Sequence, residues 1–261
     1  MKILGCLCLA ASMFVAPPTA GSQELTLNAW VPIFNGKDLQ GWTPKFTGSA
    51  VGENYRDTFR VEDGRLVVSY EGYETFEGQF GHLFYAKKLS HYRLRLEYRF
   101  LGEQTPGAPD WALMNSGIMF HAQAPETMSA DQAFPVCVEA QILGDDGKRT
   151  SGNLCSPGTH VMMKGELVTE HCVRTSELTT PLGTWTSFEI EVHGGDSILH
   201  KLNGQVVTEY SQPTLDPSDP DAKGMLDRGI PTAVVDGYVA LQAESHPVEF
   251  RNVELMLLDP R

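Results

Sequence analysis

The strictest pattern in the chain is the run "YRLRLEYRF" at 92–100, in which apolar and charged residues alternate at every position. Successive side chains of a β-strand point to opposite faces, so this run predicts a strand with one face in a core and the other in water. Segment 187–210 predicts three more strands joined by two tight turns, with Phe188, Ile190 and Val192 facing inward. Residue pairs that favour tight turns recur along the chain, at Asp63-Gly64, Asp146-Gly147, Gly194-Gly195 and Asn203-Gly204.

Short strands with regular turns, and no convincing long amphipathic helix, predict an all-β protein built as a two-sheet antiparallel jelly-roll sandwich. The chain has 261 residues, 41% of them hydrophobic, which suits one domain over residues 22–261. Segments 101–114 and 211–236 are rich in turn-forming residues and are expected to be long loops that border a binding site. A change of phase near the end predicts a β-bulge at Arg251-Asn252.

The first 21 residues have the layout of a secretory signal peptide. Lys2 precedes the apolar stretch 3–15, and small residues around Ala20 and Gly21 place a cleavage site near residues 20–22. Export is therefore expected. No segment has the length of a transmembrane helix, and a formal net charge of −13 argues against partners such as nucleic acid or anionic membranes, which attract clustered Lys and Arg.

Removal of residues 1–21 would leave three cysteines, Cys137, Cys155 and Cys172. In an oxidising compartment the preferred pairing is a disulfide between Cys155 and Cys172, with Cys137 free, although three cysteines allow three pairings. A zinc site formed by Cys155, Cys172, His160 and His171 is the weaker alternative, because this spacing matches no common zinc motif.

Three predicted strands carry unusual polar faces. In "FPVCVEAQILG", residues 134–144, one face is apolar while Glu139 and Gln141 share the other with Cys137. The other two faces hold amides, small residues and aromatics but few charges, namely Asn115, Gly117, Met119 and His121 in one strand and Tyr238, Ala240, Gln242 and Glu244 in the other.

If the three strands are neighbours, these faces form a shallow cleft suited to a sugar. Amides and carboxylates bond hydroxyl groups, and rings such as Trp111 or Tyr238 pack on the apolar faces of sugars. Glu139 is the strongest candidate for a functional residue, because a carboxylate in so apolar a segment has a perturbed pKa.

Four motifs of the chain resemble the 3-keto-disaccharide hydrolase family. They are "IFNGKDLQGW" (33–42), "NSGIMF" (115–120), "VEAQIL" (138–143) and "GYVALQAESHPVEFRNVEL" (237–255). The resemblance extends over roughly residues 30–258. It implies a concanavalin A-like, laminin-G-like jelly roll, export to the periplasm or exterior of a bacterium, and action on glycosides oxidised at carbon 3.

This chain departs from the family pattern at three places. Gly144 stands where the family has Asp after Ile-Leu, and His121 stands where an Arg is often found. The family sequence Leu-Gln-Asp-His-Gly is Leu-Gln-Ala-Glu-Ser at residues 241–245, so Glu244 replaces the His, and His246 lies two positions later.

The resemblance implies an elimination. The 3-ketone acidifies the proton on carbon 2, so one base can remove it, a second group can stabilise the enolate, and the glycosidic oxygen can leave carbon 1 before water adds back. In this hypothesis Glu139 is the base and Glu244 or His246 protonates the leaving oxygen. The side chains expected to bind the glycoside are Asn115, His121, Gln141, Trp111, Tyr238 and Gln242.

Several alternatives remain open. A divalent metal held by Glu139, His121 and Glu244 would give Glu139 the role of a ligand. Direct glycoside hydrolysis is disfavoured because the strand at 138–143 lacks a second carboxylate. A non-catalytic carbohydrate-binding module would need the aromatic rings but not the carboxylates, and a structural exported domain would need neither.

Overall fold

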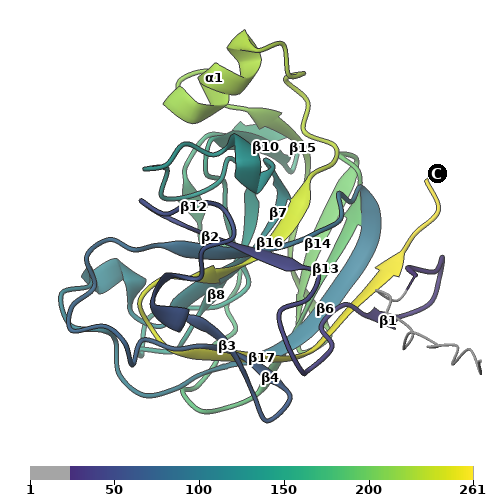
Figure 1. The fold of residues 1–261 in the computed structure, drawn as a ribbon. Coiled ribbons are helices and arrows are strands. Elements are labelled where there is room, and N and C mark those ends of the chain that lie inside the picture. The colour runs from purple at the N-terminus through teal and green to yellow at the C-terminus, as the bar shows by residue number, and fades with distance from the viewer. Residues whose placement is uncertain (1–23, 261) are drawn as a thin grey trace, which may run out of the picture.

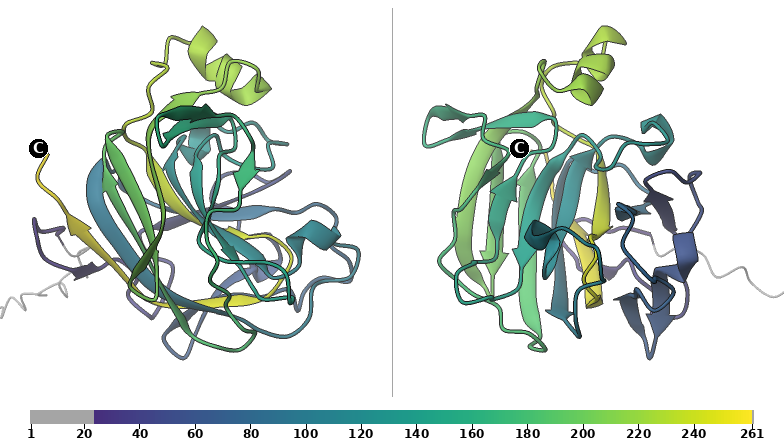
Figure 2. Two further views of the ribbon diagram at one scale, coloured as in Figure 1. Left: turned by 180° about the vertical axis from the view of Figure 1, so that it is seen from behind. Right: turned by 90° about the vertical axis from the view of Figure 1, so that its left-hand side faces the viewer.

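The computed structural model describes residues 24–260 and shows two antiparallel β-sheets packed face to face. The two layers, and helix α1 (Pro220–Asp227) set off from them at one end, are visible in Figure 1 and from two further sides in Figure 2. The predicted fold class, an all-β jelly-roll sandwich, is confirmed. The expected signal peptide, residues 1–21, lies outside the described residues.

The larger sheet has ten strands in the order β11-β10-β15-β14-β13-β6-β17-β4-β3, with β1 paired to β17. The smaller sheet has seven strands in the order β12-β9-β8-β7-β16-β5-β2. The strands are β1 (Val31–Pro32), β2 (Trp42–Phe46), β3 (Phe59–Glu62), β4 (Arg65–Val68), β5 (Gly81–Tyr85), β6 (His91–Phe100), β7 (Asn115–Ala122), β8 (Val138–Leu143), β9 (Asn153–Cys155), β10 (Thr159–Met163), β11 (Glu166–Val168), β12 (Cys172–Val173), β13 (Thr186–His193), β14 (Ser197–Leu202), β15 (Gln205–Leu215), β16 (Tyr238–Ala243) and β17 (Val248–Leu257).

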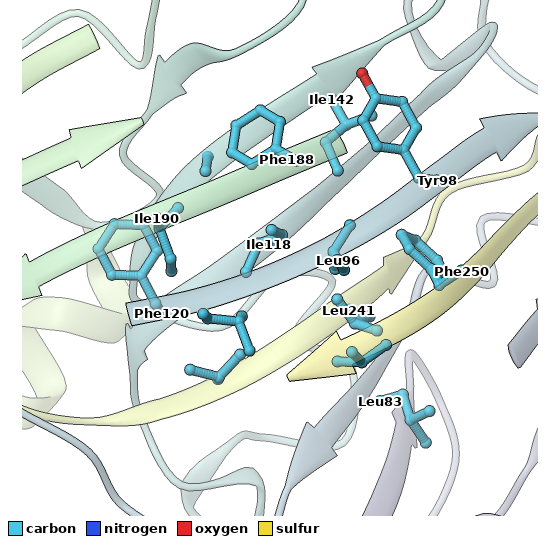
Figure 3. Close-up of a cluster of buried hydrophobic side chains, with 14 of the residues drawn as sticks. Leu83, Leu96, Tyr98, Ile118, Phe120, Ile142, Phe188, Ile190, Leu241 and Phe250 are labelled. Carbon is cyan, nitrogen blue, oxygen red and sulfur yellow. The ribbon is translucent and has the colours of Figure 1, made fainter. Parts of the chain in front are cut away.

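The core lies between the two sheets and is made of the inward faces that the alternating patterns predict. Figure 3 shows part of it, with side chains from both sheets meeting in one apolar layer. Full burial of each such side chain contributes roughly 1.5–3 kcal/mol. The labelled members are Leu83, Leu96, Tyr98, Ile118, Phe120, Ile142, Phe188, Ile190, Leu241 and Phe250.

The outer face of β6 carries the charges that the sequence places there, and each is matched by a neighbouring strand. Arg93 pairs with Glu189 at 2.7 Å, and Arg99 pairs with Glu249 at 2.7 Å. Because acid and base alternate across this face, the outer surface of the larger sheet has little net charge to attract a ligand.

The structure corrects the expected loop at 211–236. Strand β15 continues to Leu215, and an eight-residue helix, α1 (Pro220–Asp227), follows. Asp219 caps this helix by accepting the Ala222 N–H at 2.8 Å, and Pro220 occupies its first turn. An Asp-Pro start is a helix signal that the high content of turn-forming residues hid. Segment 101–114 is a loop with one short 3-10 turn, Asp110–Ala112.

Two further expectations can be compared with the backbone. The bulge at Arg251-Asn252 is confirmed, because the register of β17 against β6 shifts between Arg251 and Glu254. Asp146-Gly147, by contrast, lies in a longer loop between β8 and β9 rather than in a two-residue hairpin. Within residues 24–260, no helix is both long and apolar enough to cross a membrane.

The disulfide between Cys155 and Cys172 is confirmed, and the buried Cys137 is free. The two bonded residues are directly opposite each other in β9 and β12, so the bridge joins the last two strands of the smaller sheet. With both sulfurs bonded to each other, the zinc alternative is wrong.

Replacing both bonded cysteines by Ala should lower the free energy of unfolding by about 3 kcal/mol, because a cross-link over 17 residues restricts the unfolded chain. Denaturant titration of C155A/C172A against the wild type measures the loss. A reducing agent should destabilise the wild type by a similar amount and leave the double variant unchanged. Equal stability of both proteins without reductant would contradict the prediction.

Candidate functional site

The three strands with unusual polar faces are neighbours in the smaller sheet, in the order β8-β7-β16. Their apolar faces join the core, so the remaining faces form part of the outer surface of this sheet. The register places Met119 opposite Glu139 and Gly117 opposite Gln141. The three strands are therefore neighbours with their polar faces on one side, as a shared cleft requires.

A cavity of 690 Å³ opens on this outer surface. Five of the predicted site residues line it, and they come from four separate segments of the chain. These are Trp111, Asn115, Glu139, Gln141 and Glu244. The volume lies in the usual range for small-molecule sites and has room for a sugar ring.

Glu139 is held in the cavity wall by the shape of the neighbouring strand. A Cβ atom placed on Gly117 would lie 2.3 Å from Glu139 Oε1 and 2.8 Å from its Cδ, so the carboxyl occupies the space that the missing side chain leaves. Glu139 is only 5% exposed. The motif Asn-Ser-Gly-Ile therefore supplies the glycine that the carboxylate of the next strand needs.

Glu244 enters the cavity from the end of β16, and its position depends on a strained neighbour. Ser245 has φ 99°, a left-handed conformation that favours glycine. Its N–H donates to Tyr70 Oη at 2.7 Å, and its carbonyl accepts the Thr105 hydroxyl at 2.8 Å. The family has Gly at this position, and the backbone angle gives the physical reason.

The two carboxyl groups affect each other. Burial raises the pKa of Glu139 to about 8. Burial and then the neighbouring Glu139 raise the pKa of Glu244 well above its usual value, and the Arg149 guanidinium lowers it in part. Glu139 therefore ionises first, while Glu244 keeps its proton. One base and one acid in the same cavity are the result.

Aromatic rings form one wall of the cavity. The Trp111 side chain is 53% exposed and stacks on Phe80, with ring centroids 5.7 Å apart and planes 17° apart. Phe134 lies next in this row, 4.9 Å from Phe80, and also lines the cavity. An exposed, fixed indole beside a polar floor is suited to packing on a sugar ring.

Arg149 is a site residue that the sequence did not indicate. It is the only Arg or Lys among the residues that line the cavity. Its guanidinium donates to the carbonyl of Leu113 and pairs with Asp146 at 3.1 Å. The Asp146 carboxylate also accepts the backbone N–H of Arg149 at 2.9 Å, so the turn at Asp146-Gly147 folds Arg149 back over the site. The residues Asp146-Gly147 predicted a turn, but no sequence pattern indicated that the loop would direct Arg149 toward the cavity.

His121 does not lie in the cleft as predicted. It has φ 48°, and the register between β7 and β16 shifts at this point. This bulge turns the ring away, and Nε2 donates to the Gly194 carbonyl at 2.9 Å. Burial lowers its pKa to about 4. The proposed metal set of Glu139, His121 and Glu244 is therefore not assembled, and residues 24–260 contain no group of three His, Cys, Asp or Glu side chains placed to hold a metal.

Three other predicted residues lie near the cavity without lining it. Tyr238 packs against an apolar cluster on the same face, beside Phe134. Gln242 is buried on this face, and its Oε1 has no hydrogen-bond partner among the described residues. His246 is buried with its ring edge-on to Phe100, centroids 5.7 Å apart, which places it toward the core.

Gly144, the first of the three departures from the family pattern, is explained by packing. A Cβ atom there would lie 2.7 Å from Cβ and Sδ of Met114, and the Gly144 N–H donates to the Met114 carbonyl at 2.8 Å. An Asp side chain at this position would require Met114 to move.

Two comparisons with known proteins agree with this architecture. Two crystal structures of a candidate glycosyl hydrolase from Parabacteroides distasonis are similar in fold, each with a TM-score of 0.52. One is 20% identical, with 88% of this chain and 94% of that chain covered, and the other is 19% identical, with 88% and 100% covered. No curated protein sequence matches.

The fold thus defines a two-sheet jelly-roll protein with an open cavity on the outer face of its smaller sheet. The sequence matches the 3-keto-alpha-glucoside-1,2-lyase-like domain over residues 29–256, and the chain belongs to this family.

Proposed function

We propose that this protein is an exported enzyme that cleaves 3-keto glycosides by elimination across carbon 1 and carbon 2. The observation that carries the proposal is the pair of buried carboxyl groups, Glu139 and Glu244, in one cavity beside an exposed Trp111. Burying two such groups costs free energy that a purely structural role would not recover.

In the proposed reaction the Glu139 carboxylate removes the proton from carbon 2 of the 3-keto sugar. The electron pair of that bond forms an enolate, whose oxygen the Arg149 guanidinium stabilises by charge. The enolate then re-forms the ketone, a double bond forms between carbons 1 and 2, and the bond from carbon 1 to the glycosidic oxygen breaks. Glu244 gives its proton to the leaving oxygen. Addition of water to the unsaturated ketone completes a net hydrolysis.

The other residues of the cavity have binding roles in this proposal. Asn115 and Gln141 offer amide groups to the sugar hydroxyls, and Trp111 packs on an apolar face of the ring. His246 does not line the cavity and Glu244 does, so we assign the acid role to Glu244. Glu139, Glu244 and Asn115 all offer oxygen donors to a hard divalent cation, and a chelator tests whether such an ion takes part.

Two competing functions have specific support. The second carboxyl group that the fold adds to the cavity also permits direct hydrolysis of ordinary glycosides. The exposed Trp111 alone would serve a non-catalytic carbohydrate-binding module. Export is supported by the disulfide, which is typical of an oxidising compartment.

The deciding experiment incubates the protein with 3-keto-trehalose, 3-keto-glucosides and their unoxidised parents, with and without chelator, and follows sugar release. If sugar is released from the 3-keto glycosides and not from their unoxidised parents, the result supports elimination. A transient enone, detected by its absorbance, would identify the elimination intermediate. Release from the unoxidised parents as well would favour direct hydrolysis. Binding without any release would favour the binding module.

The pH profile gives an independent test. A base must be ionised, so kcat/KM for a keto glycoside should rise with pH and level off above the Glu139 pKa of about 8. In E244Q the midpoint of the residual activity should stay near this value, because burial is what raises the Glu139 pKa and a protonated Glu244 carries no charge. A profile that is flat between pH 6 and 9, in roughly the range that Glu139 titrates, would exclude Glu139 as the base.

A further inference from the structure

A fully buried histidine lies on the outer face of the smaller sheet, close to the cavity, and has no visible purpose in the fold. Both ring nitrogens of His82 lack hydrogen-bond partners among residues 24–260. Burial, and then Lys45, lower its pKa to about 3, so the ring is neutral. Leaving buried polar atoms without hydrogen-bond partners is unfavourable, so such atoms call for an explanation.

His82 belongs to a polar row that crosses the sheet and passes under the reacting groups. It is directly opposite Gln242, whose Oε1 is also unpartnered. Leu241 pairs with Ile118 in the antiparallel strands β16 and β7, so the next residue, Gln242, lies beside Gly117. The Glu139 carboxyl lies over Gly117. The row in order is Lys45, His82, Gln242, Gly117, Gln141 and Asn153.

The order of the strands gives this row a direction. The proposed base, Glu139, comes from β8, and the proposed acid, Glu244, follows β16 on the other side of β7. The leaving oxygen must face the acid, so the leaving group extends over β16 toward β5, which carries His82. Gly117 on β7, beside which the Glu139 carboxyl lies, is two strand spacings of roughly 4.8 Å from His82 on β5, about 10 Å, within reach of the ring next to the reacting one.

Phe134 covers this end of the row. Its ring meets the His82 ring edge-on, with centroids 5.8 Å apart, and its other side faces the cavity. The backbone of the segment that carries Phe134 is held by hydrogen bonds: the Gln132 side-chain amide donates to Gln123 at 2.9 Å and to the Phe134 carbonyl at 2.8 Å. Phe134 is thus the side chain that lies between His82 and the cavity.

We propose that His82 and Gln242 form a covered subsite for a hydroxyl-bearing leaving group, which enters when Phe134 turns aside. The imidazole nitrogens and the Gln242 amide oxygen bond hydroxyls of the leaving group, and these bonds satisfy the polar atoms that the closed site leaves unpartnered. The subsite rests on the proposed function, because the position of the acid Glu244 decides on which side of the reacting sugar the leaving group lies. The preference for a second sugar can be measured separately.

The test compares substrates that differ only in the leaving group, 3-keto-trehalose and methyl 3-keto-α-glucoside. In H82L, kcat/KM for the two-ring substrate should fall about tenfold, the effect of losing one hydrogen bond, while the methyl glycoside is unaffected. H82Q, which keeps a donor and an acceptor, should retain most of the preference. An unchanged preference in H82L would overturn the subsite and leave an internal water as the partner of His82.

His200 offers a matched control, since it is equally buried but fully bonded. Its Nδ1 donates to the Gly152 carbonyl at 3.2 Å and its Nε2 accepts from the Tyr210 hydroxyl at 2.8 Å. H200L should lower Tm without changing the preference between leaving groups, whereas H82L should keep or raise Tm.

If the wild type releases sugar from neither keto substrate, elimination fails as the function and the subsite is judged by calorimetry. Tighter binding of trehalose than of methyl α-glucoside, lost in H82L and kept in H200L, would support it. Equal binding of the two sugars, or no binding of either, would overturn it.

Discussion

Replacing Glu139 by Gln is expected to reduce turnover of a 3-keto glycoside by about 10²–10⁴-fold, the usual contribution of a positioned general base. Gln has nearly the same shape, so it fits the space above Gly117, but it cannot accept the proton from carbon 2. The fold should be kept. At pH above 8 the variant should be more stable than the wild type, because it removes a charge from a buried position.

The sign of that stability effect follows from linkage. The pKa of Glu139 is raised on folding, so its contribution to stability is present at low pH and is lost as the pH rises from about 4.5 to about 8. Buried histidines such as His200, with a lowered pKa of about 4, act in the opposite direction below pH 6.5. Between pH 6.5 and 8 the carboxyls dominate, and E139Q should flatten the loss of stability there.

Glu249 provides the matched control for this replacement. It is also buried, but it pairs with Arg65 at 3.2 Å and with Arg99 at 2.7 Å on the far side of the sandwich. E249Q should lower stability and leave turnover unchanged, the reverse of E139Q. Full activity in E139Q, measured as initial rates of sugar release, would remove the elimination mechanism as written.

Adding a single methyl group at Gly117 should reduce turnover by about 10²-fold, the loss that a displacement of about 1 Å can cause in a positioned group. The new Cβ would lie 2.3 Å from Glu139 Oε1, so the carboxyl must move out of its seat. The backbone angles of Gly117 are outside the left-handed region, so the backbone itself accepts Ala, and the cost of the new methyl group falls on the displaced Glu139 carboxyl.

A double variant separates this effect from general damage to the sheet. If Gly117 acts only through Glu139, then adding G117A to E139Q should cost little further activity, because the base is already absent. If the fold-losses in turnover of G117A and E139Q multiply in the double variant, Gly117 has its own contact with the substrate. A cooperative thermal unfolding transition of G117A alone would rule out misfolding as the cause.

Much of the fold was predictable because its causes are local in sequence. The alternation at 92–100 specifies which side chains of β6 enter the core, and the turn residues at 194–195 and 203–204 specify two hairpins. Helix α1 was missed although its signal, Asp219 before Pro220, is local, because the surrounding prolines and aspartates also fit a loop.

The candidate site was predictable only in part. Glu139 and Gln141 were found because a carboxylate and an amide interrupt an apolar strand. His121 was misplaced because the bulge that turns it away depends on pairing with β16, and Arg149 was missed because its turn gives no direction in space. The unpartnered nitrogens of His82 follow from what packs above them, which no local pattern records.

The sequence by itself determined many of the strands, the identity of their apolar faces and the presence of a polar strand face with Glu139, since periodicity acts on residues near one another in the chain. Only the tertiary structure decided that Glu244 shares the cavity of Glu139, that Gly117 makes room for the carboxyl, and that Phe134 covers His82. Those relations join strands far apart in the sequence, and the pKa that makes Glu139 a usable base arises from the burial they produce.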